Sequence, residues 1–290
     1  MATEQAALDG VTVVVVTYNS AHCLPALGQT LKDCPNVVVA DNGSHDGTPD
    51  RVAQHLPQAR VLALPTNLGF GAANNRALAV TQTPFALLLN PDCEIGPAGI
   101  AALVDVAQQV PEAAIVAPQL TNEAGRPELN YRWPSLYWKP QGPVAEGLAC
   151  VGFVCGACML FRRSAFDGVG YFDEDFFLYY EDDDLCLRLF QARRPLVLAP
   201  GVQAVHRSRG SVRGKSPWRS EYLRGYHHAQ SKLIFSAKHH SRQRAVGQRA
   251  KLLFTTTLAL PLRALFFSPR LLARMAGRWR GLLDWRPRAS

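Results

Sequence analysis

Three acidic stretches carry the side chains best suited to chemistry in this sequence. The first, 88-LLNPDCE-94, ends an apolar run with Asp92 and Glu94, and the others are 39-VADNGSHDGT-48 and 179-YYEDDDLCLRL-189. Apolar runs of this length are typical of buried strands, so the acids are predicted where strands meet solvent. Carboxylates at such places can bind a divalent cation, accept hydrogen bonds from a nucleotide or remove a proton.

Asp92 and His206 are the candidate metal ligands. Magnesium and manganese prefer carboxylate oxygen and usually keep water and substrate phosphates as their other ligands, so one or two protein ligands suffice. The alternative for Asp92 is an Asx turn after the strand. His206 ends a second predicted strand, VQAVH, and is either a second metal ligand or a structural histidine.

The cluster 181-EDDD-184 opens a predicted helix. Acids in a first turn are favoured by the helix dipole, which is the structural explanation. Crowded carboxylates also raise one another's pKa, which prepares a general base. Leu185, Leu189 and Phe190 are predicted on the core side of this helix, so residues 181 and 182 could reach the rim of a pocket.

Asp41 ends another predicted strand, before an Asn-Gly turn. It could accept hydrogen bonds from a nucleobase or ribose, or the turn could cap the next helix through Ser44, Asp46 and Thr48. The Gly-rich stretch 67-NLGFGAANN-75 would bring its backbone close to an anion before a helix N-terminus.

The elements that must position these residues alternate between strand and helix. Apolar runs predict strands at 11–19, 37–44, 60–64, 85–90 and 114–120, a strand followed by a helix start at 151–166, and strand, turn, strand at 196–207. Helices are predicted at 20–33, 46–56, 71–82, 97–110 and 181–192. This order predicts an α/β domain with a mostly parallel, twisted sheet and helices on both faces. Ligands bind beyond the carboxyl ends of such strands, where Asn19, Asp41 and Asp92 lie.

Charge divides the chain near residue 210. Of 31 Lys and Arg residues, 19 lie in residues 206–290, together with only two of the 23 acids. The expected organisation is a catalytic domain at 1–210, with a nucleotide-binding half at 11–120 and an acceptor half at 121–210, followed by a basic helical region at 211–290. Its Trp, Phe and Leu residues predict binding to an anionic membrane surface; the alternative is helix packing with dimerisation.

The cysteines and the N-terminal residues indicate in which cellular compartment the protein is expected. Seven cysteines, an odd number mostly within apolar stretches, favour free thiols in a reducing, cytoplasmic setting. Cys155 and Cys158 form a CxxC, which without a second pair is a weak metal or redox signal and more typical of small-residue packing. No signal peptide or membrane-spanning run is recognisable, and 252–267 reads as an interfacial segment. His227, His228, His239 and His240 are interpreted as part of the basic face.

Taken together, the motifs resemble the inverting family 2 glycosyltransferases of the GT-A fold, in the rhamnosyltransferase-like branch. The resemblance spans residues 11–207 and rests on these stretches in order: 16-VTYNS-20, 40-ADNGSHDGT-48, 67-NLGFGAANN-75, 89-LNPD-92, 156–189 and 205-VHR-207. It departs from the family pattern at Asn90, which replaces the first acid of the metal-binding DxD motif, and at Tyr171, where Gly is common.

The resemblance implies a role for each matching residue. Asp182 would be the general base, with Asp183 as its rival, and Glu181 would position the acceptor or the base. Asp92 and His206 would hold Mn²⁺ or Mg²⁺. The nucleotide-sugar site would comprise Thr17, Asn19, Asp41, Asn67, Gly69, Asn74, Gly156 and Ala157.

The implied reaction is sugar transfer by a hexosyltransferase. The donor would be a dTDP- or UDP-sugar, with rhamnose as the sugar that the branch suggests. The acceptor would be a lipid-linked or polysaccharide glycan at the inner face of the cytoplasmic membrane, in cell-envelope polysaccharide biosynthesis. No nucleic-acid partner is expected. Two alternatives stay open: a nucleotidyltransferase that makes nucleotide-sugars, and a non-catalytic polyanion- or membrane-binding protein on a transferase fold.

Overall fold

The computed structural model describes residues 2–133, 143–207, 217–265 and 268–286 of the 290-residue chain. The chain divides into two compact units, Met1–Phe172 with Leu185–Arg213, and Asp173–Asp184 with Gly214–Ser290. The boundary expected near residue 210 lies outside the described residues.

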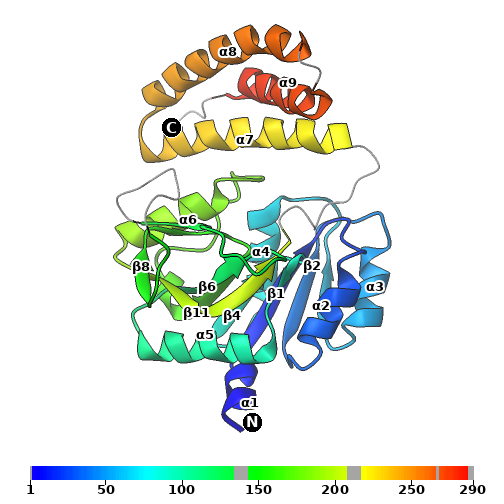
Figure 1. Ribbon diagram of the computed structural model, residues 1–290, viewed down its shortest axis with the longest axis vertical. Helices are drawn as coiled ribbons and strands as arrows, with labels where there is room; N and C mark the ends of the chain where they lie inside the picture. Colours follow the sequence, from blue (N-terminus) through cyan, green and yellow to red (C-terminus); the bar gives the residue numbers. More distant parts are fainter. Residues whose placement is uncertain (1, 134–142, 208–216, 266–267, 287–290) are drawn as a thin grey trace. The chain divides into compact units, whose positions relative to one another are not determined.

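The first unit is built on one large sheet (Figure 1). Within the described residues this sheet has nine strands, in the order β3-β2-β1-β4-β10-β6-β11-β5, with β8 also paired to β11. They are β1 (Val11–Thr17), β2 (Val37–Asp41), β3 (Arg60–Ala63), β4 (Phe85–Leu89), β5 (Cys93–Glu94), β6 (Ile115–Thr121), β8 (Ala149–Val151), β10 (Cys158–Arg162) and β11 (Leu196–His206). Two short strands, β7 (Tyr131–Arg132) and β9 (Phe153–Val154), pair separately.

The sheet is mostly parallel, as predicted. β3, β2, β1, β4, β6 and β11 run in one direction. The strand β10 lies antiparallel between β4 and β6, while β5 and β8 run antiparallel to β11. The predicted strand-turn-strand at 196–207 is a single strand, β11, whose pairing with β6 shifts register between Ala199 and Gln203. Pro200 and Gly201 lie within this shift, where the ladder is interrupted rather than reversed.

Helices cover both faces of the sheet, which also confirms the prediction. One core packs α1, α2, α3 and α5 against the side chains of Val11, Val13 and Val15, and the other packs α4 and α6 against Val14. These helices are α1 (Ala2–Asp9), α2 (Leu24–Leu31), α3 (Thr48–His55), α4 (Phe70–Ala79), α5 (Pro97–Gln109) and α6 (Glu181–Gln191), with a 3-10 turn η1 (Arg163–Phe166). The alternation of Val side chains between two cores is what a strand buried on both faces requires.

One predicted core residue is wrong. Leu185 and Leu189 of α6 are fully buried, but Phe190 is 50% exposed, and Cys186 occupies the core position instead. Residues 185, 186 and 189 follow the i, i+1, i+4 spacing of one helix face, and residue 190 falls beyond its edge.

In its described residues, the second unit contains three helices and the segment Asp173–Asp184. The helices are α7 (Pro217–His239), α8 (Arg242–Leu265) and α9 (Pro269–Asp284), and α7 lies alongside α9 (Figure 1). A Cβ atom at Gly225 would overlap the carbonyl of Arg274, and one at Gly277 would overlap that of Tyr222. Glycine is therefore required where the two backbones approach.

Candidate functional site

The ends of β1 and β2 are joined by hydrogen bonds to a buried carboxylate. The register aligns Thr17 with Asp41, and the Thr17 hydroxyl donates to Asp41 Oδ1 over 2.9 Å. Ser44 donates its hydroxyl to the same oxygen over 2.6 Å and its backbone N–H to Oδ2 over 3.0 Å. Asp41 therefore holds its own turn in place, and its contact with a nucleotide stays a prediction.

Asn19 ties the end of β1 to the same turn. Its φ of +52° is in the left-handed region that Asn tolerates. Its backbone N–H donates to the Ser44 hydroxyl over 2.8 Å, and its side-chain oxygen accepts from the His45 N–H over 2.9 Å. Two predicted site residues, Asn19 and Asp41, thus share Ser44 as a partner.

Asn42 is a positioning residue that the sequence reasoning did not assign to the site. Its buried amide donates to Asn67 Oδ1 (2.9 Å) and to the Gly69 carbonyl (3.1 Å), while its oxygen accepts from the Leu68 N–H (2.8 Å). These bonds fasten the Gly-rich stretch to the end of β2, just before α4. In the sequence, the position of Asn42 directly after Asp41 was the signal that could have assigned it to the site.

The remaining predicted nucleotide-sugar residues gather around the start of α4 and the end of β4. The Asn74 amide donates back to the Phe70 carbonyl over 3.0 Å, within its own helix. A Cβ on Gly156 would lie 3.4 Å from the Phe70 ring, and the Ala157 carbonyl accepts from the Asn90 N–H over 2.9 Å. Gly156 and Ala157 are therefore placed beside the segment that carries Asp92.

Asp92 and His206 are brought together by strand pairing. The antiparallel register of β5 and β11 aligns Cys93 with His206, and the Arg207 N–H donates to the Asp92 carbonyl over 2.9 Å. The His206 Nε2 and Asp92 Oδ1 atoms lie 3.7 Å apart, on side chains only 14% and 3% exposed. Their separation is too long for a hydrogen bond but short enough for both atoms to bind one ion at about 2.0–2.2 Å from each.

The donor set suits a divalent cation that substrate also ligates. Among the residues that the structure describes, no group of three His, Cys, Asp or Glu side chains forms a complete protein site. An oxygen and a nitrogen ligand leave positions for water and phosphate oxygens, which Mg²⁺ and Mn²⁺ commonly keep. Asp92 and His206 therefore fit the predicted metal, and their ligation of it stays a prediction.

The acidic turn, residues 181–184 at the start of α6, belongs to the second unit and contains both buried and half-buried carboxyl groups. Glu181 and Asp184 are buried, at 6% and 0% exposure, whereas Asp182 and Asp183 are half-buried. Burial, with smaller effects of Asp182 and Asp183, raises the pKa of Glu181 well above its ordinary value. Glu181 thus retains a proton more readily than an ordinary glutamate, and Asp182 and Asp183 are the acids of the turn that solvent reaches.

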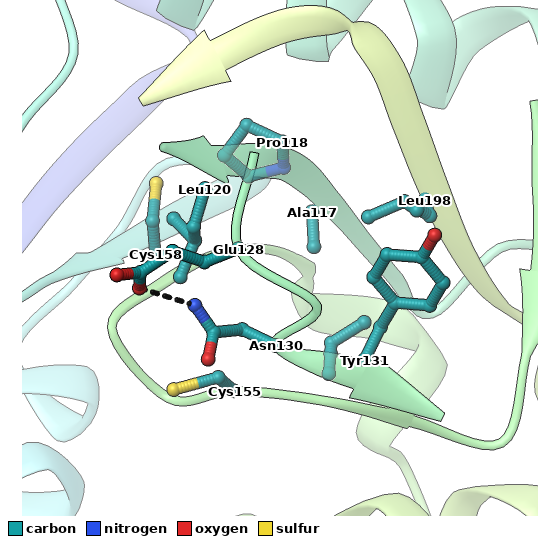
Figure 2. Close-up of a pocket in the computed structure, with 10 residues that line it drawn as sticks. Ala117, Pro118, Leu120, Glu128, Asn130, Tyr131, Cys155, Cys158 and Leu198 are labelled. Carbon is teal, nitrogen blue, oxygen red and sulfur yellow. Dashed lines mark hydrogen bonds between the residues drawn. The ribbon is translucent and has the colours of Figure 1, made fainter. Parts of the chain in front are cut away.

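A small pocket in the first unit lies beside the CxxC motif (Figure 2). It has room for about one water molecule and is therefore too small for a nucleotide-sugar. Glu128, Asn130 and Tyr131 line it together with Cys155 and Cys158, and Asn130 donates to Glu128 over 3.0 Å. None of the predicted site residues lines this pocket. All seven cysteines lie within the described residues and none forms a disulfide; in the CxxC motif Cys158 is buried and Cys155 is half-buried.

Comparison with protein families matches two models to this chain. Residues 12–170, more than half of the chain, match Glycosyl transferase family 2, and residues 98–279 match Glycosyl transferase family group 2.

Relatives of known activity match over most of the chain. It is 32% identical to the N-acetylglucosaminyl-diphospho-decaprenol L-rhamnosyltransferase of Mycobacterium tuberculosis (strain ATCC 25618 / H37Rv), over 80% of this chain and 86% of that protein. It is 26% identical to the low-salt glycan biosynthesis hexosyltransferase Agl10 of Haloferax volcanii, over 70% of this chain and 69% of the relative.

Solved structures show the same fold at lower identity. The mannosyltransferase PcManGT from Pyrobaculum calidifontis, in complex with GDP-Man and Mn²⁺, aligns with a TM-score of 0.58 at 19% identity, covering 94% of this chain and 87% of that one. GalNAc-T7 with UDP, GalNAc and Mn²⁺ aligns with a TM-score of 0.55 at 15% identity, covering 79% and 50%. The sheet and its helices have the GT-A fold, as predicted.

Proposed function

The chain belongs to glycosyl transferase family 2, and on that premise we propose that it transfers rhamnose from a dTDP- or UDP-sugar to a hydroxyl of a lipid-linked glycan. The observation that carries this proposal is the match over 80% of this chain to a transferase whose name specifies rhamnose and a diphospho-decaprenol acceptor. Transfer would proceed by a single displacement that inverts the anomeric carbon.

The donor would be held by the strand ends of the first unit. Thr17, Asn19 and Asp41 would line the base and ribose pocket, and the segment fastened by Asn42 would shape the sugar site with Asn74, Gly156 and Ala157. Asp92 and His206 would hold a divalent cation, for which the Mn²⁺ in two structural neighbours supplies a precedent. Such an ion, when bound, stabilises negative charge on a departing diphosphate. The proposed ion is Mn²⁺ or Mg²⁺.

The acceptor would be activated by the acidic turn. Asp182 would take the proton from the acceptor hydroxyl, because a general base must be ionised and must be reachable by substrate. Glu181 is buried, and its raised pKa favours the protonated form, so it suits positioning of the acceptor or the base better than proton removal. Asp183 has similar exposure to Asp182 and remains the rival base.

A product assay tests the proposed transfer. Incubation of the full chain with dTDP-rhamnose or UDP-sugars, Mn²⁺ and a short polyprenyl-diphosphate-linked N-acetylglucosamine is expected to release nucleoside diphosphate and lengthen the acceptor by one sugar. A nucleotidyltransferase would instead consume a nucleoside triphosphate and a sugar phosphate and release pyrophosphate. No product with either substrate set would support a non-catalytic binding protein and contradict the transfer.

We also propose that the basic helices bind the anionic inner face of the cytoplasmic membrane. No helix within the described residues is long and apolar enough to span a bilayer. Phe254 and Leu258 of α8 lie one turn apart and are 67% and 56% exposed, and Lys251 and Arg263 on the same helix are exposed cations. Exposed apolar side chains bordered by cations are typical of interfacial helices. The alternative use of this surface is a homodimer interface.

Replacement of both Phe254 and Leu258 by Ser is expected to reduce flotation with anionic liposomes, because these side chains would supply the apolar area inserted between head groups. The matched control is Phe190→Ser, which removes an exposed aromatic of the first unit. Unchanged flotation of the double variant would contradict the membrane site. Loss of a dimer in sedimentation velocity, with flotation retained, would favour the alternative.

A further inference from the structure

The turn that leads into the acidic cluster has a strained backbone. Tyr179 and Tyr180 have φ values of +70° and +68°, in the left-handed region, and immediately precede Glu181. Large side chains avoid this region because the Cβ atom crowds the backbone, and two consecutive cases are unusual. Such strain persists only where surrounding structure enforces it, and it concentrates at functional sites.

Helix α7 supplies contacts that hold this turn. The Ser231 hydroxyl donates to the Leu178 carbonyl over 2.9 Å, directly before the strained pair. The Tyr180 ring contacts those of His228 and Phe235, with centroids 5.4 and 5.5 Å away, and the Phe177 ring stacks on His227 at 4.3 Å. The segment and the helix both belong to the second unit.

The rings of His227 and His228 suit this packing when they are uncharged. Burial lowers the pKa of His227, and burial together with Lys232, Arg278 and Arg274 lowers the pKa of His228 to about 4. Both rings are therefore neutral near pH 7, so stacking against aromatic side chains does not require a charge to be desolvated.

Helix α7 also contacts Asp184, the last residue of the acidic cluster 181–184. Asp184 is fully buried and lies 2.7 Å from both His239 Nε2 and Lys238 Nζ, while Lys238 reaches Asp173 Oδ2 at 2.5 Å. The Asp184 N–H donates to the Tyr180 carbonyl over 2.8 Å, which closes the first turn of α6. Asp184 is thus held by two side chains of α7.

We propose that one face of α7 acts as a clamp that positions the catalytic acids. The clamp comprises His227, His228, Ser231, Phe235, Lys238 and His239. By fixing Leu178 and Asp184 on either side of the strained tyrosines, it sets the direction in which Asp182 leaves the helix. The inference rests on the proposed function of Asp182 and assigns a positioning role to a helix of the basic C-terminal region.

The clamp explains why the strain is tolerated. An unconstrained chain would relax Tyr179 and Tyr180 to negative φ, which would redirect the start of α6 and the side chain of residue 182. Displacement of a reacting group by about 1 Å can lower a rate by about 100-fold, although substrate binding is retained. The clamp should therefore affect turnover more than donor affinity.

The first test weakens the clamp at two points. Ser231→Ala and, separately, His239→Gln are expected to lower kcat by about 10- to 100-fold while the donor KM and the nucleotide Kd stay unchanged. His240→Gln is the control for loss of a neighbouring histidine, whose ring approaches the clamp only at the edge of Phe235, with 6.3 Å between the ring centroids. Wild-type kcat in both clamp variants would overturn the proposal.

The second test asks whether the positive φ of residue 179 affects turnover. Tyr179→Gly and Tyr179→Ala both remove the ring, but only Gly adopts positive φ without steric cost. The Gly variant is expected to have the higher kcat, and its advantage is expected to grow in the His239→Gln background. Equal kcat for the pair in both backgrounds would overturn the proposal.

Hydrogen exchange separates failure of the clamp from failure of the proposed function. Ser231→Ala and His239→Gln are expected to increase amide exchange in a peptide covering residues 173–186, whereas His240→Gln should not. This readout requires no turnover. If amide exchange is unchanged in both clamp variants, the clamp is overturned even if the enzyme transfers sugar. If exchange increases in the variants but the wild type has no transferase activity, only the proposed reaction is overturned.

Discussion

Replacement of Asp182 by Asn is expected to lower kcat by about 10²- to 10⁴-fold, the range typical of losing a general base. The amide is nearly the same size but cannot accept the proton of the acceptor hydroxyl near neutral pH. Donor binding should be retained because the residues proposed to bind the nucleotide lie in the first unit and are unchanged. The measurements are single-turnover transfer rates and calorimetric binding of the nucleotide.

Asp183→Asn is the control for this assignment, since Asp183 neighbours Asp182 and has similar exposure. It is expected to retain most of the activity. A large loss in Asp183→Asn with near-normal turnover in Asp182→Asn would transfer the role of base to Asp183. Full activity in both variants would contradict an acid of this turn as the base.

Asp92→Asn and His206→Gln are each expected to weaken Mn²⁺ binding by about 10- to 100-fold or more. Replacing a residue that only hydrogen-bonds to a metal ligand already has an effect of this size, and loss of the ligand itself should not have a smaller one. Transfer should fall by about 10²- to 10³-fold, as when one group that stabilises developing negative charge is removed. Mn²⁺ binding is measured by electron paramagnetic resonance in the presence of nucleoside diphosphate, which separates metal affinity from turnover.

Glu94→Gln provides the matched control for the metal site. Glu94 lies two residues beyond Asp92, in the strand β5 that pairs with β11, and its ion pair with Arg207 over 2.7 Å is partly exposed. Such pairs contribute only about 0–1 kcal/mol, so folding and Mn²⁺ affinity should change little. If Asp92→Asn also leaves Mn²⁺ affinity unchanged, Asp92 is not a ligand.

Several features of the site required long-range pairing and could not be predicted from local sequence. The resemblance assigned Asp92 and His206 to one metal site, but the antiparallel pairing of β5 with β11 that places them 3.7 Å apart joins two segments far apart in the chain and was not predicted. The antiparallel direction of β10 and the single strand at 196–206 have the same origin, because hydrophobic periodicity does not encode strand direction or partner. The burial of Asp184 and the exposure of Phe190 depend on which neighbours pack against α6.

The sequence by itself determined the α/β class, most strands and helices of the first unit, the family, and the acidic residues suited to the chemistry. These properties are local: apolar runs fix strands, amphipathic spacing fixes helices, and motifs preserve their residue order. Only the tertiary structure decided the strand pairing that places His206 beside Asp92, the hydrogen bonds from Asn42 to the Gly-rich stretch, and the contacts of α7 with the strained turn before Glu181. Each of these depends on contacts between distant segments, which form only when burial of the cores brings those segments together.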